Sequence, residues 1–253
     1  MNWMLGSIKG MPHELERIRR IGWYQAYYSL TGVERIESGS PIDELLNGGI
    51  ALGSVVDVFG ENGVGKTQLS FQLCVEGARR GLKGEDPRPL LFVDACGTFR
   101  PERVQEIAEL RGVEGVLDRV MVKEVRGLEE QGRLIDELYK RAGLFQLIVF
   151  DTITENFMAG EAGFEERAEF SRQLLELGFV ALKGRTAILL TNTVRVRLET
   201  GELVETAERV MRQNVHIRIR MSKVDGLRAR LVEPDLGVEV KYSIGRGGIA
   251  SAL

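Results

Sequence analysis

The chain has 253 residues, of which 43% are hydrophobic and 28% are charged, and its formal net charge at pH 7 is −3. A length and composition of this kind suit one soluble α/β domain with a short extension, or two small domains. The slightly acidic balance excludes a protein that is basic throughout, so any contact with nucleic acid must come from a local patch.

The first 35 residues differ in pattern from the rest and predict an N-terminal arm. It contains a short helix candidate, PHELERIRR (12–20), followed by the aromatic stretch IGWYQAYYSL (21–30). The arm lacks the basic start and apolar run of a signal peptide, and no part of the chain approaches the roughly 20 apolar residues of a membrane span. The two cysteines, Cys74 and Cys96, have no metal-type spacing, so we expect a reduced, cytoplasmic protein outside any membrane.

Residues 36–253 predict a single α/β domain. Five apolar, β-branched runs are expected as strands, at 54–60, 90–95, 119–125, 146–151 and 186–192. The amphipathic stretches between them are expected as helices, at 66–80, 101–111, 127–142 and 165–182. This alternation is typical of a mostly parallel central sheet flanked by helices on both faces.

Three later segments alternate apolar with polar residues, at 214–223, 228–233 and 238–244. A short turn that contains Asp225 and Gly226 separates the first two segments. We therefore expect C-terminal antiparallel strands appended to the sheet.

The segment GENGVGKT (60–67) directly follows the first predicted strand and opens a predicted helix. It fits the pattern G-x-x-x-x-G-K-[ST], in which backbone N–H groups cradle phosphates, the lysine reaches the β- and γ-phosphates and the hydroxyl ligates Mg²⁺. Asp151, which ends the apolar run LIVFD, is the expected partner of Thr67 at the metal. The predicted nucleotide-binding residues here are Gly60, Glu61, Asn62, Gly63, Val64, Gly65, Lys66, Thr67 and Gln68.

Two longer stretches resemble the ATPase core of the RecA/RadA recombinases: IESGSPIDELLNGGIALGSVVDVFGENGVGKTQLSFQLC (36–74) and FVDACGTFRPERVQEIAE (92–109). The similarity covers about residues 36 to 253, and the pattern is that of archaeal RadA, its RadB-type paralogues and their eukaryotic counterparts. It implies a RecA-like P-loop fold. The short upstream region implies a paralogue without the helix-hairpin-helix domain that precedes the core in full-length recombinases.

The resemblance implies ATP and Mg²⁺ as cofactors and a place for Arg103 against the adenine. In addition to Lys66, the resemblance implies two further catalytic positions, and this chain has a different residue from the family at both. Where the family has DTEGTF this chain has DACGTF, so Cys96 replaces the glutamate that activates the attacking water. Where the family has TNQV this chain has TNTV, so Thr193 replaces the glutamine that senses the γ-phosphate.

Cys96 is a poor substitute for a glutamate. An ordinary thiol has a pKa of about 8.5, and a nearby triphosphate raises the pKa further because a second anion is disfavoured. Asp94 shares the strand face with Cys96, but two residues along a strand is roughly 6–7 Å, too far without a relay. A positioned general base contributes ~10²–10⁴ in rate, so we expect weak or absent hydrolysis.

The resemblance also implies two DNA-binding loops. The first, 156–169, carries four glutamates and one arginine, which is the wrong sign for phosphate. In the second, 194–213, four glutamates balance the arginines, and the strand that follows has an arginine-bearing face that a solvated outer surface explains equally well. Binding of single-stranded DNA therefore stays open. The candidate residues are Arg195, Arg197, Arg209, Arg212, Arg218 and Arg220.

The sequence WYQA (23–26) has the aromatic-x-x-Ala form by which recombinase subunits dock onto a neighbouring core. Trp23 would fill a pocket, and Ala26 would allow close approach. The alternative is that Trp23 and three nearby tyrosines pack the arm onto its own core. If the motif docks in this way, the expected partners are the main RadA-type recombinase, a second copy of this chain, or both.

Three functions remain open from the sequence. The first is a RadA-type paralogue that binds ATP and assists recombination and repair with little turnover. The second is an active DNA-dependent ATPase with another base, and the third is a RecA-fold regulatory module that does not act on DNA. The segment GTFRPER (97–103) argues against the third, whereas the missing basic loops keep it open.

Overall fold

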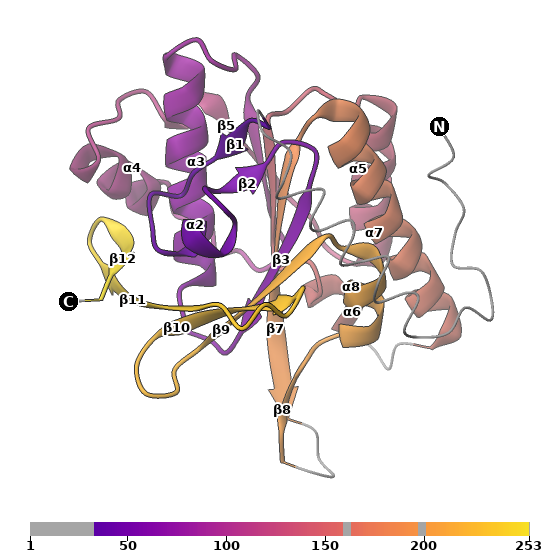
Figure 1. Cartoon of the computed structure of the whole chain (residues 1–253). Coiled ribbons are helices and arrows are strands. Elements are labelled where there is room, and N and C mark those ends of the chain that lie inside the picture. The colour runs from indigo at the N-terminus through magenta and orange to yellow at the C-terminus, as the bar shows by residue number, and fades with distance from the viewer. Residues whose placement is uncertain (1–32, 159–162, 197–200, 253) are drawn as a thin grey trace. The chain divides into compact units, whose positions relative to one another are not determined.

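The computed structural model describes residues 33–158, 163–196 and 201–252, and Glu34–Leu253 form one compact unit (Figure 1). The arm predicted for residues 1–35 lies almost wholly outside the described residues, so its boundary and the motif at Trp23 and Ala26 stay predictions. In the part of the chain that is described, no helix is long and apolar enough to cross a membrane.

The described strands form a two-stranded sheet and a ten-stranded central sheet. The small sheet contains β1 (Arg35–Ile36) and β2 (Ile50–Ala51). The central sheet contains β3 (Val55–Gly60), β4 (Leu90–Asp94), β5 (Val120–Glu124), β6 (Leu147–Asp151), β7 (Ala187–Val196), β8 (Leu203–Glu205), β9 (Ile217–Ser222), β10 (Arg228–Glu233), β11 (Glu239–Gly245) and β12 (Gly248–Ser251). The helices are α2 (Ile42–Leu45), α3 (Lys66–Leu82), α4 (Pro101–Leu110), α5 (Leu128–Lys140), α6 (Glu155–Met158), α7 (Phe164–Gly184) and α8 (Glu208–Asn214), with a 3₁₀ turn at Leu117–Arg119.

The central sheet runs in the order β12-β11-β10-β9-β3-β7-β6-β4-β5, and β8 pairs with β7 outside this path. The strands from β9 to β5 in this order are parallel, and β10, β11 and β12 continue the sheet in antiparallel fashion. Figure 1 shows α3 and α4 on one face of the sheet and α5 and α7 on the other. The predicted fold class is therefore confirmed.

The sequence placed the long elements within a few residues and missed the short ones. β7 extends to Val196 because its end pairs with β8, and β9 begins only at Ile217 because α8 occupies the residues up to Asn214. Elements as short as α2, α8 and β12 contain too few residues for a periodicity to show. β9 also pairs in parallel with β3, a register that the alternation alone did not predict.

Apolar side chains fill both faces of the sheet. On the α5 and α7 side, Phe150 and Phe170 belong to a large cluster of buried residues. On the α3 side, the Phe71 ring lies 5.6 Å from that of Phe92 and 5.7 Å from that of Phe99, and the last two rings are 4.9 Å apart. Phe99 belongs to the turn that follows β4, so this aromatic triad anchors the turn to the core.

A buried charge cluster lies where β3, β8, β9 and β10 come together. Arg218 on β9 is 5% exposed, and its guanidinium pairs with Glu205 on β8, with Glu233 on β10 at 3.1 Å and with Asp57 on β3 at 3.7 Å. The guanidinium carbon also lies 5.2 Å from the centre of the Phe59 ring. One arginine therefore faces three carboxylates.

Asp57 is the least compensated of these carboxylates. It is fully buried, and neither of its oxygens has a hydrogen-bond partner among the described residues. Burial raises the pKa of the Asp57 carboxyl from 3.8 to about 7, and the charge of Arg218 opposes the shift. The folded state therefore favours the protonated form. This contribution to stability is complete below about pH 4 and is lost as the pH rises through about 7.

Replacing Asp57 by the neutral, isosteric asparagine is expected to weaken this pH dependence. The melting temperature of Asp57→Asn should exceed that of the wild type at about pH 7.5. In a chain of this size, each kcal/mol gained in the free energy of unfolding raises the melting temperature by about 2–4 °C. The difference should narrow at about pH 5, where the folded wild type already carries the proton. Thermal unfolding followed by circular dichroism measures both values. A variant less stable than the wild type at both pH values would show that Asp57 is ionised and stabilises the fold through Arg218.

Candidate nucleotide-binding site

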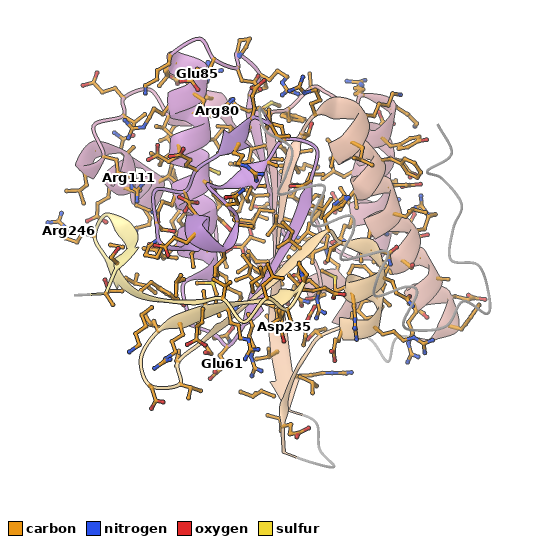
Figure 2. All side chains as sticks on the ribbon, viewed as in Figure 1. Glu61, Arg80, Glu85, Arg111, Asp235 and Arg246 are labelled. Carbon is orange, nitrogen blue, oxygen red and sulfur yellow. The ribbon has the colours of Figure 1, made fainter. Side chains whose placement is uncertain are left out.

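The loop predicted to bind phosphate joins β3 to α3 at the carboxyl end of the sheet, where Figure 2 labels Glu61. Gly65 caps α3 in the left-handed conformation (φ 99°), and among the described residues no side chain makes a cap hydrogen bond to the start of the helix. A Cβ at Gly60 would lie 2.1 Å from the Met221 carbonyl oxygen, and one at Gly65 would lie 2.8 Å from Ile244 Cδ1. These two positions require glycine, and the cradle they form suits a phosphate anion.

Lys66 begins α3 and holds its ammonium on this loop. The ammonium donates hydrogen bonds to the carbonyl oxygens of Gly60 at 2.7 Å and Glu61 at 2.9 Å. Burial lowers the pKa of Lys66, the charge of Lys223 acts in the same direction, and Asp151 opposes the shift. The positive charge of Lys66 therefore lies on the loop, next to the place that a bound phosphate would occupy.

A second lysine, which the sequence analysis missed, lies at the same loop. Lys223 follows β9, and its Nζ lies 3.2 Å from the place that a Cβ of Gly63 would occupy. In the sequence it is one more polar residue at the end of an alternating strand, and only the parallel pairing of β9 with β3 reveals its place. Lys223 adds to the positive potential over the loop.

Thr67 and Asp151, the predicted metal pair, are in direct contact. The Thr67 hydroxyl donates to Asp151 Oδ2 at 2.8 Å, and the Thr98 hydroxyl donates to the same oxygen at 3.1 Å. The Thr191 hydroxyl donates to Asp151 Oδ1. Hydroxyl and carboxylate oxygens are ligands that Mg²⁺ prefers, so these residues fit the implied metal. Thr98 and Thr191 were not predicted, because a lone threonine gives no signal in a sequence.

Asp94 holds the turn that carries Cys96. Its carboxylate accepts hydrogen bonds from the backbone N–H groups of Cys96 at 3.1 Å, Thr98 at 3.0 Å and Phe99 at 2.9 Å. The carboxylate is therefore engaged within its own turn. That Asp94 does not serve as a base for a water at the nucleotide site stays a prediction.

The Cys96 residue is exposed, yet its sulfur lies against Thr152 at the end of β6. Partial loss of water around the sulfur is the largest cause that raises the pKa of the Cys96 thiol. The charges of Glu155 and Asp151 act in the same direction, and hydrogen bonds from Thr152 oppose them. The thiol is consequently neutral near pH 7 and is a poor proton acceptor.

Arg103, expected beside the adenine, is anchored to three segments. It donates to Gln68 Oε1 on α3 at 2.7 and 2.9 Å and to Glu106 on α4 at 2.5 Å. It also donates to the carbonyl oxygens of Gly245 at 2.8 Å and Arg246 at 2.7 Å, in the β11–β12 turn where Figure 2 labels Arg246. These bonds engage the N–H donors along the edge of the guanidinium, and the adenine contact stays a prediction.

Thr193 lies near the end of β7 in a hydrogen-bonded network. Its N–H donates to Asn192 Oδ1 at 2.7 Å, and its hydroxyl lies 3.4 Å from that of Thr206. The same Asn192 oxygen accepts a bond from Thr154 at 2.7 Å, and the Asn192 amide nitrogen donates to Glu205 at 3.0 Å. Thr193 is thus connected to the β6 end on one side and to β8 on the other.

The arginines proposed as DNA contacts differ in exposure. The prediction that Arg218 contacts DNA is wrong. The alternation indicated an outer face for this residue, but it is buried between carboxylates of β8 and β10. Arg197 lies outside the described residues. The exposed members are Arg195, Arg209, Arg212 and Arg220.

The fold defines a class: an α/β domain with a RecA-like core, whose loop between β3 and α3 has the P-loop pattern. The chain belongs to the Rad51 family, whose family model matches residues 31–251. Lys66, Thr67, Cys96, Asp151 and Thr193 all lie within the matched region.

Individual relatives carry names from DNA repair and recombination. The DNA repair and recombination protein RadB of Pyrococcus abyssi is 31% identical over 221 residues, which cover 84% of this chain and 91% of that protein. RadA of Metallosphaera sedula is 32% identical over 241 residues, which cover 87% of this chain and 73% of that protein. The meiotic recombination protein DMC1/LIM15 homolog of Mus musculus is 36% identical over 152 residues, which cover 57% of this chain and only 45% of that protein. The match therefore covers less than half the length of the DMC1 relative and most of the length of the RadB relative.

Lys66→Ala is expected to remove most of the stabilisation that ATP gives this chain. A bound ligand stabilises the folded state by RT ln(1 + [L]/Kd), about 2.7 kcal/mol at a hundredfold excess over Kd. Loss of the ammonium at the phosphates should bring the ATP-dependent rise in melting temperature close to zero. Lys83→Ala, at the opposite end of α3, is the matched control and should keep the full rise. An unchanged rise in Lys66→Ala would place the nucleotide elsewhere.

Proposed function

We propose that this chain is an ATP-binding, RadB-like paralogue that assists homologous recombination and DNA repair and hydrolyses ATP weakly or not at all. The observation that carries the proposal is the contrast between an intact phosphate and metal set at Lys66, Thr67 and Asp151 and a neutral thiol at Cys96. The names of the RadB, RadA and DMC1 relatives support a role in recombination and repair.

In this proposal the loop amides and Lys66 hold the phosphates of ATP, and Thr67 and Asp151 hold Mg²⁺. The metal, when bound, supplies charge neutralisation at the phosphates. What the chain lacks is a residue that takes a proton from water, because the Cys96 thiol is neutral and Asp94 is engaged in its own turn. A missing base costs roughly 10²–10⁴ in rate. ATP then acts chiefly as a ligand that selects one conformation.

A second candidate function, an active DNA-dependent ATPase, is favoured by one observation. Glu155, the first residue of α6, is close enough for its charge to raise the pKa of the Cys96 thiol. Its backbone N–H donates to the Thr152 carbonyl oxygen at 3.2 Å, which keeps it one turn from the contact between Thr152 and Cys96. In this candidate the Glu155 carboxylate would take over the role of the base. Turnover measured with and without single-stranded DNA separates the two functions.

Direct contact with DNA has limited support in the charge pattern. Arg195, Arg209 and Arg220 are exposed and suit phosphate contacts, whereas Arg212 lies 3.4 Å from Glu233. The net charge of −3 adds no long-range attraction to a polyanion. We therefore propose that partner proteins contribute to any recruitment of this chain to DNA.

Restoring the carboxylate at position 96 is expected to raise turnover. Cys96→Glu should increase kcat by about tenfold or more with little change in nucleotide affinity, because the new group acts on the attacking water in the transition state. Adding Thr193→Gln should help this variant more than it helps the wild type, since both residues would act around the same water. Steady-state ATP hydrolysis and equilibrium nucleotide binding measure the two effects separately.

Cys96→Ser is the matched control, because it keeps the size of the side chain and supplies no base. Its turnover should equal that of the wild type. A large fall in Cys96→Ser would make the thiol itself catalytic. Fast turnover in both the wild type and Cys96→Ser would favour another base such as Glu155 and would contradict the proposed function.

The arm is expected to mediate contact with a RecA-type core, either the main recombinase or a second copy of this chain. Trp23→Ala combined with Ala26→Glu should abolish that association while the chain remains folded, because the anchor and the close approach are both lost. Light scattering and a pull-down with the recombinase measure the association, and circular dichroism checks the fold. Loss of the fold instead would show that the aromatic residues pack within their own molecule.

A further inference from the structure

Two networks described above meet at one residue, Glu205. This glutamate is the last residue of β8 and is 4% exposed. One of its carboxylate oxygens pairs with the Arg218 guanidinium, and the other accepts a hydrogen bond from the Asn192 amide at 3.0 Å. Glu205 therefore joins the buried charge cluster to the end of β7.

On the β7 side, the connection continues to the nucleotide-binding site. Asn192 Oδ1 accepts bonds from the Thr154 hydroxyl and from the Thr193 N–H, each at 2.7 Å. Thr154 lies three residues after Asp151, the metal-site carboxylate, and Thr193 lies two residues after Thr191, whose hydroxyl donates to that carboxylate. The Asn192 amide is thus fixed between the candidate metal site and β8.

On the other side, the connection continues to the strand that leads into the phosphate loop. Arg218 Nε lies 3.7 Å from Asp57 on β3, three residues before Gly60. Neither Asp57 oxygen nor Arg218 Nε has a hydrogen-bond partner among the described residues. The guanidinium therefore links β3 with the carboxylates of β8 and β10 in one buried cluster.

We propose that Arg218 and Glu205 form a clamp that positions Asn192 and Thr193, so that nucleotide binding at the loop after β3 is coupled to the docking of β8. Arg218 and Glu205 are positioning residues, because neither contacts the loop itself. β8 contains only three residues and is anchored to β7 by the Val194, Arg195 and Val196 pairings and by the bond from the Thr206 N–H to the Thr193 carbonyl at 2.9 Å. The buried charge pair of Glu205 and Arg218, at the end of β8, therefore contributes a large part of the interactions that hold β8 in place. The inference rests on the proposed function in taking this site to bind ATP.

Hydrogen exchange of the full-length protein tests the clamp. In the wild type, saturating ATP with Mg²⁺ should slow exchange of the backbone amides of residues 203–206 by about 5-fold or more, the low end of ordinary coupling between sites. In Glu205→Gln the side chain keeps its shape and its acceptor for Asn192 but loses the charge that holds Arg218. The protection ratio for residues 203–206 should fall to about one in this variant, while the rise in melting temperature with ATP persists.

Glu233→Gln is the matched control. It removes a different carboxylate from the same guanidinium, at 3.1 Å, on a strand that does not contact Asn192. Its protection ratio should remain that of the wild type. Arg218→Lys is a second variant that keeps the charge of the cluster. A single ammonium cannot reproduce the forked contacts of the guanidinium, so part of the coupling should be lost.

The possible outcomes distinguish a failure of the clamp from a failure of the proposed function. Full nucleotide-dependent protection in Glu205→Gln, or equal loss in Glu205→Gln and Glu233→Gln, would overturn the clamp and leave ATP binding untouched. If ATP stabilises the wild type but does not slow exchange at residues 203–206, the clamp is likewise overturned and ATP binding is not. A wild type that ATP does not stabilise at all would overturn the proposed function and the clamp together.

Discussion

The carboxylate of Asp151 is the contact on which the candidate site depends. It ends β6 and accepts hydrogen bonds from hydroxyls on α3, on the turn after β4 and on β7. The main-chain carbonyl of Asp151 also accepts the Ala95 N–H at 3.0 Å, which fixes the end of β4 beside the end of β6. Because parallel strands present their carboxyl ends at one edge, a single buried carboxylate can assemble the phosphate loop, the Cys96 turn and the Thr193 segment.

The same assembly fixes the turn that carries Cys96. The turn after β4 is held by Asp94, by the Phe71, Phe92 and Phe99 rings and by Thr98. Its position is therefore set by the fold and not by the identity of residue 96. In the proposed function, the thiol at this position leaves the binding groups intact and supplies no proton acceptor, so binding and hydrolysis would be separable properties of the same site.

The sequence predicted the parts of the site that follow one another along the chain. The glycines and Lys66 of the loop, and Asp151 after its apolar run, each carry a local pattern whose chemistry is known. The site residues that the sequence did not predict are brought into place by pairing between distant segments. Lys223 reaches the loop only because β9 lies parallel to β3, and Glu205 meets Arg218 only because β8 folds back on β7. Alternation placed Arg218 outside, since period-two patterns cannot distinguish an exposed face from one enclosed by carboxylates of neighbouring strands.

The proposed function requires that this chain binds ATP without hydrolysing it effectively. The most direct test mixes an excess of the chain with labelled ATP and Mg²⁺ and measures bound and hydrolysed nucleotide in the same sample over time. Nearly all the ATP is expected to be bound at once and then hydrolysed about 10²–10⁴ times more slowly than the ~10 s⁻¹ of a typical enzyme, with turnover times from about ten seconds upward. Hydrolysis of the bound ATP within seconds, without DNA or a partner, would contradict it.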